Sequence, residues 1–479
     1  MVIVRVPVDT AVAARAGSDQ PIPPPDRLNL SLLPLTCFPR RLRSILLARI
    51  TVLALLLLNL LVVSLAAIVP QRIGTSNHEF ERWQEEHLTW IPLLDRFGLD
   101  HIFSTPWFAI LLTLTLVALL CSLMSQIRAA WHQTFTLGAR EGKGPWQHFS
   151  IPYEVVGHLL RRSGYWQIKA DERQIRYLKN PWGYWGNPML HGGMVVTLTA
   201  ALLMALTQQR GLLQLNEGEV HGADEAWTYS EHGPFAPAIS FPEAIQLVYL
   251  LPEFWAGSDE LKGLSCGVRF VAPGQGRESR LTLSSDTVVT RLGFRIYQGV
   301  GFGYSFTVEL SPTTGERQTL RLAIQQPERK GMAGYGNFRI HGVPYVLKAK
   351  YLLDHASAGE RQGVNTLALR LADGAQALGE LTLAPGGSGK LGPYQVRLLE
   401  VRRWGSMVIT RLRGLVGVFV GFALIIVGSS LIYLFPVREV LLVREGDGVL
   451  LCWRPGRFAL FHQNEHERLL QGLRAWNPS

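Results

Sequence analysis

The hydrophobic residues of this chain gather in four long runs that contain no Lys, Arg, Asp or Glu. The runs are residues 50–69, 107–127, 189–207 and 414–435. A helix rises about 1.5 Å per residue, so each run is long enough to cross the roughly 30 Å of hydrocarbon in a bilayer. The pattern therefore predicts four membrane-spanning helices. Their expected bounds are 45–69, 105–127, 187–207 and 412–435.

The residues that flank the first run resemble those that flank the apolar region of a secretory signal peptide, but the run is too long for such a region. Arginines precede it, and the small residues Ala66 and Ala67 lie near its end. The apolar region of a signal peptide is typically about 7–15 residues, and this run is longer. We therefore predict a retained anchor. The residues before it, 1–44, include the proline-rich "PIPPPD" and are predicted to form a partly disordered tail.

Residues 208–411 follow a different pattern, with short alternating or β-branched segments separated by turn residues. Examples are "LTLSSDTVVTRLGFRIYQ" (281–298), "YSFTVELSPTTGERQTLRLAIQ" (304–325), "NFRIHGVPYVLKAKYLL" (337–353), "NTLALRLADGAQALGELTLAPG" (365–386) and "PYQVRLLEVRRW" (393–404). A period of two is typical of strands that bury one face. We predict an all-β domain, either a sandwich or an open barrel-like sheet.

Shorter signals occur in residues 128–186 and 436–479, which are predicted to be small α/β segments. "PYEVVGHLLRRSG" (152–164) predicts a helix, and "YWQIKADERQIRYLK" (165–179) predicts a hairpin. In the C-terminal segment, "EVLLVREGDGVLLCWR" (439–454) predicts a hairpin that turns at Asp447-Gly448, followed by a helix from about Asn464.

Charges in the short connections predict the orientation of the chain. The 70–104 loop has three Arg against six acidic residues, whereas the 128–186 segment has nine basic residues against four acidic ones. Because Lys and Arg in short loops resist translocation, the tail, the 128–186 segment and the C-terminus are predicted to be cytoplasmic. The 70–104 loop and the 208–411 domain are then periplasmic. One flank disagrees, because four arginines lie just outside the fourth run, namely Arg402, Arg403, Arg411 and Arg413. Long domains, however, translocate largely regardless of charge.

These patterns define the expected fold class and location. The class is a polytopic α-helical membrane protein with four transmembrane helices, a large extracytoplasmic all-β domain and small α/β cytoplasmic segments. The tail lacks the Ser-rich, acid-poor character of a transit peptide, so we expect the inner (plasma) membrane of a bacterium. The net charge of +10 lies mainly on the inner side, since 208–411 carries 21 basic and 19 acidic residues. This distribution favours contact with anionic membrane lipid over binding of nucleic acid.

Cysteine and catalytic patterns exclude several classes of protein. The four cysteines, Cys37, Cys121, Cys266 and Cys452, are scattered, and no CxxC occurs. This argues against a thiol oxidoreductase and against a covalent haem-attachment site. No acid–base or nucleophile motif is recognisable, so the chain alone is not expected to be an enzyme.

Five stretches stand out by their order along the chain. They are "AAIVPQ" (66–71), "FGLDHIFSTPWFAILLTLTLVALLCSL" (97–123), "RRSGYWQIKADERQIRYLKNPWGYWGNPMLHGGMVV" (161–196), "LGFRIYQGVGFGYSF" (292–306) and "GFALIIVGSSLIYLFPVREVLLV" (421–443). From about residue 45 to the C-terminus, this order resembles the ResB (CcsB) family of System II cytochrome c biogenesis. One departure is "RLRG" (411–414), where the family often has Asp-Pro-Gly.

The resemblance implies a role in haem handling. A ResB-type protein works with a ResC (CcsA) membrane protein to carry haem b in transit across the membrane and to present it to apocytochrome c. The partner carries a tryptophan-rich WWD segment, which does not occur in this chain. The chain is therefore expected to be an accessory subunit of a haem-ligating complex, without ligase activity of its own.

His191 is the main candidate site residue, because it stands inside the third apolar run, followed by Gly192 and Gly193. An ionisable residue within a membrane span is costly and is a functional hypothesis by default. It could be an interfacial histidine hydrogen-bonded to a neighbouring helix, or an axial ligand of haem iron. The resemblance favours the ligand, since ResB proteins carry a haem-binding histidine in a span. The two glycines would let a flat macrocycle or another helix approach closely.

The remaining candidates have simpler alternatives. Trp182 and Trp185 fit either an interfacial aromatic belt or a haem access path. "GVGFG" (299–303) lies among strands and is expected to be a turn or bulge, and the GxxxG of Gly417 and Gly421 is expected to be a helix contact. With no other histidine expected in a span, the second iron ligand would come from the partner. A scaffold for cytochrome assembly that never binds haem is the alternative function, and a sensor is a weaker one.

Overall fold

The structure is a computed structural model. It describes residues 45, 48–135, 145–171, 174–256, 258, 260–272, 278–312, 316–327, 329, 332–353, 364–374, 376–446 and 448–475. Except for Ile45, these residues belong to one compact unit, Leu46–Ser479. The predictions for the 1–44 tail, for Cys37 and for Asp447 in the hairpin turn fall outside the described residues.

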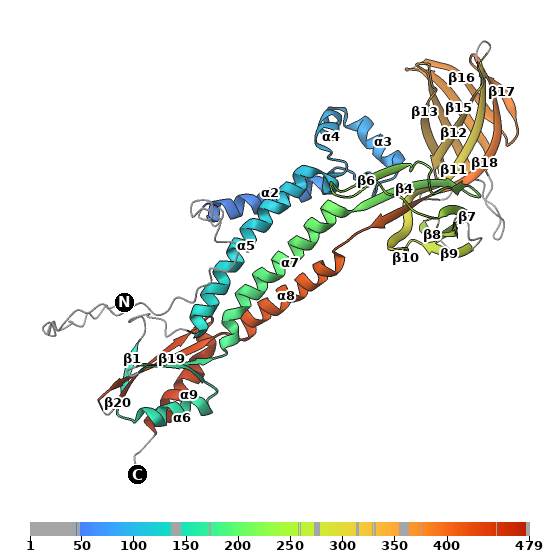
Figure 1. Ribbon diagram of the computed structural model, residues 1–479. Coiled ribbons are helices and arrows are strands. Elements are labelled where there is room, and N and C mark those ends of the chain that lie inside the picture. The colour runs from blue at the N-terminus through green and yellow to red at the C-terminus, as the bar shows by residue number, and fades with distance from the viewer. Residues whose placement is uncertain are drawn as a thin grey trace. The chain divides into compact units, whose positions relative to one another are not determined.

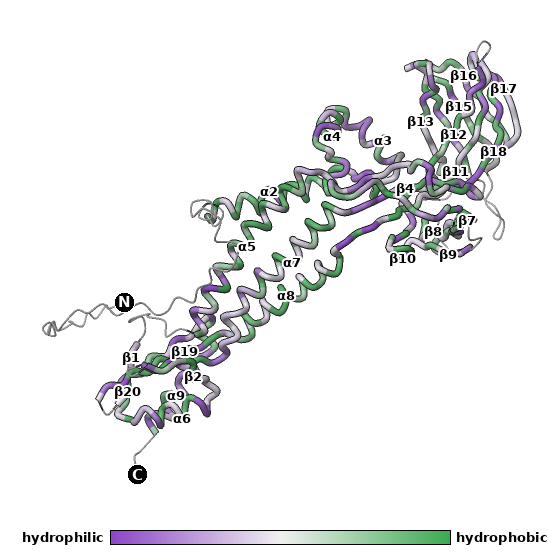
Figure 2. Tube along the Cα trace, viewed as in Figure 1, coloured by the Kyte–Doolittle hydropathy of each residue, from purple (hydrophilic) through white to green (hydrophobic). Residues whose placement is uncertain are grey.

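Four helices are long and apolar enough to cross a membrane, as the hydrophobic runs predict. They are α2 (Arg49–Ile68), α5 (Pro106–Phe135), α7 (Gly186–Thr207) and α8 (Leu415–Leu434). Figure 2 shows apolar residues along the length of each helix. α5 is longer than predicted, because no glycine or proline stops the helix between the expected end at 127 and Phe135.

The β domain joins α7 and α8 almost directly. β4 (Gln209–Asn216) begins where α7 ends, and β18 (Tyr394–Arg411) ends just before α8 begins. β4 and β18 are antiparallel neighbours, paired from Gln209 with Arg411 to Asn216 with Trp404. The helix pair therefore continues into a strand pair, as Figure 1 shows.

The domain consists of two sandwiches that share long strands. Its other strands are β5 (Val220–His221), β6 (Tyr229–His232), β7 (Ala244–Phe254), β8 (Leu261–Val271), β9 (Glu278–Ser284), β10 (Val289–Arg291), β11 (Phe294–Pro312), β12 (Gln318–Gln325), β13 (Ala333–Arg339), β14 (Val346–Leu353), β15 (Val364–Asp373), β16 (Gln376–Leu383) and β17 (Ser388–Leu391). A seven-stranded sheet contains β10-β11-β18-β4-β6, with β12 and β17 attached. One half of β11 and β18 packs against the β13–β16 sheet, and the other half packs against the β5-β7-β8-β9 sheet.

The glycine-rich "GVGFG" lies where β11 passes from one core to the other. The register of β11 against β18 shifts between Gln298 and Phe302. The Gly301 N–H donates to Ser406 Oγ at 3.0 Å, and this hydroxyl donates back to the Gly301 carbonyl at 2.7 Å. The prediction of a turn or bulge is confirmed, since the shift is a β-bulge within a strand.

The 70–104 connection holds short helices that the sequence pattern did not predict. They are α3 (Asn77–Glu86), η2 (Leu88–Trp90), α4 (Ile91–Phe97) and η3 (Ile102–Ser104). Ser76 begins α3 with a capping box, because its hydroxyl accepts from the Glu79 N–H while the Glu79 side chain accepts from the Ser76 N–H. Gly98, in the left-handed conformation at φ 62°, ends α4.

The second loop and the C-terminal tail form one α/β unit. Its five-stranded sheet has the order β1 (Trp146–Phe149), β20 (Gly448–Pro455), β19 (Arg438–Glu445), β3 (Gln174–Lys179) and β2 (Trp166–Ala170). Buried residues of α6 (Tyr153–Arg162) and α9 (Gln463–Arg474) complete the core. The predicted hairpins and helices are confirmed. The sequence did not predict that β3 of the second loop pairs with β19 of the C-terminal tail. This pairing requires the loop and the tail to lie on the same side of any membrane that the helices cross.

Candidate functional site

His191 lies in the first half of α7, and its side chain is partly exposed. Its Nδ1 lies 3.0 Å from the carbonyl oxygen of Asn187. A carbonyl oxygen only accepts hydrogen bonds, so Nδ1 is the protonated nitrogen, and in the neutral ring Nε2 carries the lone pair. Among the residues that the structure describes, none is hydrogen-bonded to Nε2. Histidine ligands of metals commonly have this arrangement, with one nitrogen held by a carbonyl and the other available.

The seam between α7 and α8 determines the direction in which His191 points. Gly186, Gly193 and Ala200 on α7 are spaced by seven residues, and so are Gly421 and Gly428 on α8 and Gly414, which caps the start of α8. A Cβ atom would lie 2.8 Å from the Gly186 carbonyl if added to Gly428, and 2.8 Å from the Gly193 carbonyl if added to Gly421. The two helices therefore meet backbone to backbone. His191 precedes Gly193 by two residues, about 200° around the helix, so it faces away from α8.

The two glycines after His191 have different surroundings. A Cβ atom on Gly193 would lie 2.6 Å from the Gly421 carbonyl, whereas the nearest atom to a Cβ on Gly192 would be Leu123 Cδ1 at 3.9 Å. The two glycines were predicted to allow the close approach of either a macrocycle or another helix. Gly193 allows the approach of another helix, α8. The face of Gly193 that a macrocycle would need is occupied by α8, and only Gly192 has an open face.

The GxxxG of α8 belongs to the same seam. A Cβ atom on Gly417 would lie 2.9 Å from the Cβ of Ala200, and one on Gly421 would overlap the Thr197 side chain. The predicted helix contact at Gly417 and Gly421 is therefore internal to the chain.

Trp182 and Trp185 lie on η4 (Pro181–Trp185), the 3-10 turn that leads into α7. Trp182 is 60 % exposed, and the Trp185 ring meets the edge of the Trp131 ring of α5 at 6.4 Å between centroids. These tryptophans lie at the ends of two apolar helices, where aromatic belts are common. His191 lies further along α7 than either tryptophan.

A second histidine lies on a membrane helix. The sequence pattern ended the second span at 127, but α5 continues to Phe135 and carries His132 in its last turn. The prediction that no histidine besides His191 lies within a span was made for a second span that ends at 127, and α5 adds His132 beyond that end. At about 1.5 Å per residue, α5 is longer than the hydrocarbon thickness, so His132 belongs to the end of this helix.

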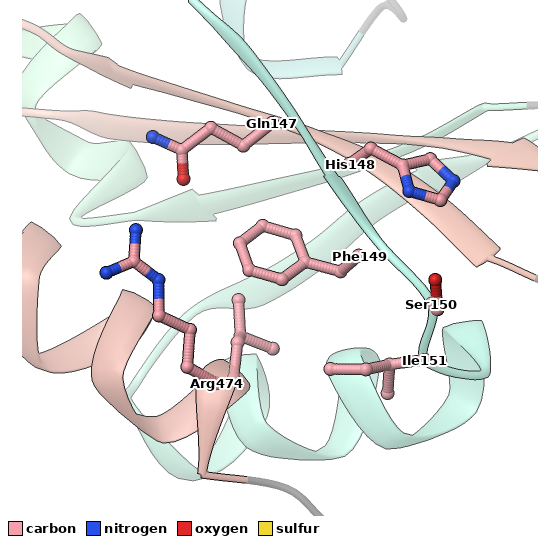
Figure 3. A pocket seen from close by; sticks show the side chains of 7 residues that line it. Gln147, His148, Phe149, Ser150, Ile151 and Arg474 are labelled. Carbon is pink, nitrogen blue, oxygen red and sulfur yellow. The ribbon is translucent and has the colours of Figure 1, made fainter.

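Two cavities lie on the same half of the molecule as His191. One of about 230 Å³ is lined by Gln133, Gly183, Tyr184, Asn187, Ile432, Pro436, Val437, Gly456 and Arg457. It includes Asn187, whose carbonyl holds the His191 ring. The other, of about 540 Å³, lies in the α/β unit and is lined by Gln147, His148, Phe149, Ser150, Ile151, Leu473 and Arg474. Figure 3 shows His148 pointing away from Phe149 and Arg474, so this cavity brings no titratable cluster together.

The other histidines that the structure describes are scattered over the β domain, the helices and the α/β unit. No group of three His, Cys, Asp or Glu side chains suited to a metal occurs among the described residues. His232 and His341 are exposed, as expected of surface histidines, but His221 is buried against the Trp227 ring. Burial lowers the pKa of His221. His466 stacks on Trp453 with 4.4 Å between ring centroids, so its ring packs within the α/β unit.

A charged network that the sequence did not reveal lies between the 70–104 connection and the β domain. The Nδ1 atom of His101 lies 2.6 Å from an Asp100 carboxylate oxygen, and the other oxygen accepts from Arg72 at 3.2 Å. Glu231 of β6 is 9 % exposed and pairs with Arg210 at 3.2 Å. The hydrogen bond to Asp100 raises the pKa of His101, and burial raises the pKa of Glu231. The sequence shows that Asp100 and His101 are adjacent. It does not show that Glu231 lies near His101, because the fold brings these two residues together.

Together these features define a class of protein: a four-helix membrane protein with a large β domain and a half-buried histidine on one of its helices. Residues 50–238 match the ResB-like family. This segment, which includes His191 and three of the four helices, is similar to the ResB-like family, in agreement with the resemblance that the sequence predicted. No curated protein matches the chain. Similarity to this family indicates involvement in cytochrome c biogenesis.

Proposed function

We propose that this protein passes haem across the inner membrane together with a ResC/CcsA-type partner, for attachment to apocytochrome c by the System II route. The observation that carries the proposal is the state of the His191 ring. Its Nδ1 is held by the Asn187 carbonyl at 3.0 Å, so Nε2 is the nitrogen available to iron. Haem is the cargo in this reaction, and the chain contributes binding and orientation.

The surroundings of His191 support a shared site. α8 covers the opposite face of α7, so the histidine side of the helix is directed away from the glycine seam. Gly192 adds an open surface beside the ring, with Leu123 as its nearest neighbour. A partner helix on this side would supply the second axial ligand. Trp182 and Trp185 lie closer to the start of α7 and would line the approach of the porphyrin.

The proposed orientation places the α/β unit in the cytoplasm and the β domain in the periplasm. The excess of basic residues in 128–186 supports it. The pairing of β3 with β19 requires the 128–186 segment and the C-terminal segment to share one side of the membrane, and the charge then assigns that side to the cytoplasm. His191 then lies near the cytoplasmic end of α7, where haem would be received.

The test is an absorption spectrum of the purified protein, expressed with and without its ResC-type partner. We expect a Soret band that His191→Ala removes or shifts, whereas His132→Ala leaves it unchanged. Imidazole added to His191→Gly should restore the band if the lost group is an iron ligand. An unchanged band in His191→Ala would return this residue to a packing role. The absence of haem under every condition would favour the alternative of a membrane scaffold for cytochrome assembly.

A further inference from the structure

The chain segment after β20, Gly456–His462, exposes large apolar side chains. Phe458 is 44 % exposed, Leu460 is 78 % exposed and Phe461 is 82 % exposed. Phe458 precedes the 3-10 turn η5 (Ala459–His462), and the other two residues lie in it. A cluster of this kind on the surface of a folded unit marks a contact with an apolar phase or a partner.

The fold holds these side chains outward. At the start of the segment, the Gly456 N–H donates to the Val437 carbonyl at 2.9 Å. Phe458 has the left-handed conformation, φ 60° and ψ 48°, which is costly for a residue with a Cβ and persists only where the surroundings impose it. After the segment, Glu465 of α9 accepts from Lys179 at 2.8 Å. The exposure of the apolar residues is therefore a property of the folded α/β unit.

The apolar surface continues onto the end of a membrane helix. The rings of Phe458 and Tyr433 lie 6.1 Å apart between centroids. Tyr433, Leu434 and Phe435 close α8, and they are 58 %, 71 % and 46 % exposed. Because α8 is long and apolar enough to cross a membrane, the lipid that surrounds its end would also reach Phe458.

A cation lies beside this surface. Arg457 is exposed and lines the cavity of about 230 Å³ at the ends of α5, α7 and α8. The lining also includes Gln133 and Asn187, and it contains no acidic residue. A guanidinium without a competing carboxylate suits the phosphate of a lipid headgroup.

We propose that Gly456–His462 is an in-plane anchor, in which Phe458, Leu460 and Phe461 insert into the leaflet at this end of the helices. Arg457 binds the phosphate of an anionic phospholipid there. The occupant is lipid, because the patch continues the surface of α8 and carries a cation at its edge. The anchor would fix the α/β unit against the bilayer, and it does not depend on haem binding.

The first test measures depth in the membrane with the full chain in nanodiscs of phosphatidylcholine and phosphatidylglycerol. Nitroxide labels at Leu460→Cys and Phe461→Cys are compared with a label at Gln471→Cys, an exposed position on α9 of the same unit. We expect the first two labels to be relaxed by oxygen and shielded from a water-soluble nickel chelate, and the third to show the reverse. If the labels at 460 and 461 are as accessible to the nickel chelate as the label at 471, the proposed anchor is wrong. Shielding that appears only when the ResC-type partner is added would overturn it in favour of a protein contact.

The second test concerns the headgroup. Native mass spectrometry of the purified protein should show phosphatidylglycerol binding that Arg457→Gln weakens about fivefold, the effect expected of one basic residue at an anionic surface. The matched control is Arg468→Gln, an exposed arginine on α9, which should change nothing. Equal binding by wild type and Arg457→Gln would overturn the assignment of Arg457. Displacement of the lipid by inorganic phosphate at similar concentration would show a site for free anions instead.

Discussion

His191 and His101 differ in the group that accepts a hydrogen bond from Nδ1, and this acceptor influences whether the ring favours the protonated form. Both hold Nδ1 in a hydrogen bond, but His191 faces the neutral Asn187 carbonyl and His101 faces the Asp100 carboxylate. The carboxylate raises the pKa of His101 and so favours the protonated ring. The sequence identified His191 by its place in an apolar run. It did not identify His101, whose setting depends on contacts with a distant strand.

Replacing His101 by Gln should lower stability in a pH-dependent way. The pKa of His101 is raised in the folded protein, so its stabilising contribution is fully present below its unfolded pKa of about 6.5 and is lost as the pH rises through the folded value. The difference in apparent melting temperature between wild type and His101→Gln should therefore be largest in acid and should shrink above neutrality. His232→Gln, at an exposed site, serves as the control. A difference that stays constant with pH would contradict the role of the Asp100 pair.

Cys266 should be chemically inert in the folded protein. It is 1 % exposed in the core of one sandwich, and burial raises the pKa of its thiol to about 11. Since the thiolate is the reactive form, a maleimide reagent should label Cys266 only after denaturation. Rapid labelling of the native protein at this position, located by mass spectrometry of peptides, would point instead to a redox role.

At the scale of elements, the sequence predicts each helix and strand pair better than it predicts their partners. The spans, both hairpins of the α/β unit and most strands follow from local periodicity. The glycine seam does not, because a seven-residue spacing on each helix becomes a contact only when Gly193 is set against Gly421. The sharing of β11 and β18 between two cores is likewise a property of pairing, and alternation alone predicts one sandwich as readily as two.

The contact between α7 and α8 predicts opposite effects on stability for alanine substitutions at the adjacent residues Gly192 and Gly193. Gly193→Ala would place a Cβ atom 2.6 Å from a backbone carbonyl of α8, and such overpacking typically costs about 1–3 kcal/mol. Gly192→Ala has room, with its nearest neighbour at 3.9 Å, and should be neutral or stabilising by up to about 1 kcal/mol through helix propensity. Thermal unfolding of the two variants in the same detergent would measure the difference. If Gly193→Ala and Gly192→Ala are equally stable, then α7 and α8 are not in backbone contact at Gly193.

At the scale of the whole molecule, two long-range pairings constrain how the chain crosses a membrane. Gln209 pairs with Arg411 where α7 ends and just before α8 begins, so both ends of the β domain leave the bilayer on one side. β3 pairs with β19 at the other end of the same helices. Hydropathy and charge predict the same arrangement from local signals. They could not predict that residues 145–179 and 438–474 fold together, because no periodicity links segments so far apart.

This arrangement predicts the outcome of reporter fusions. Alkaline phosphatase inserted in the β domain after Leu353 should be active, since this enzyme folds only outside the cytoplasm, and a fluorescent protein at the C-terminus should fluoresce, since it matures inside. The four arginines near the fourth span, Arg402, Arg403, Arg411 and Arg413, oppose this orientation, so their replacement by Gln should leave both signals unchanged or stronger. Replacing basic residues of the 128–186 segment should weaken both signals together. Reporters that are active on the same side of the membrane would be incompatible with the continuous passage from α7 to β4 and from β18 to α8.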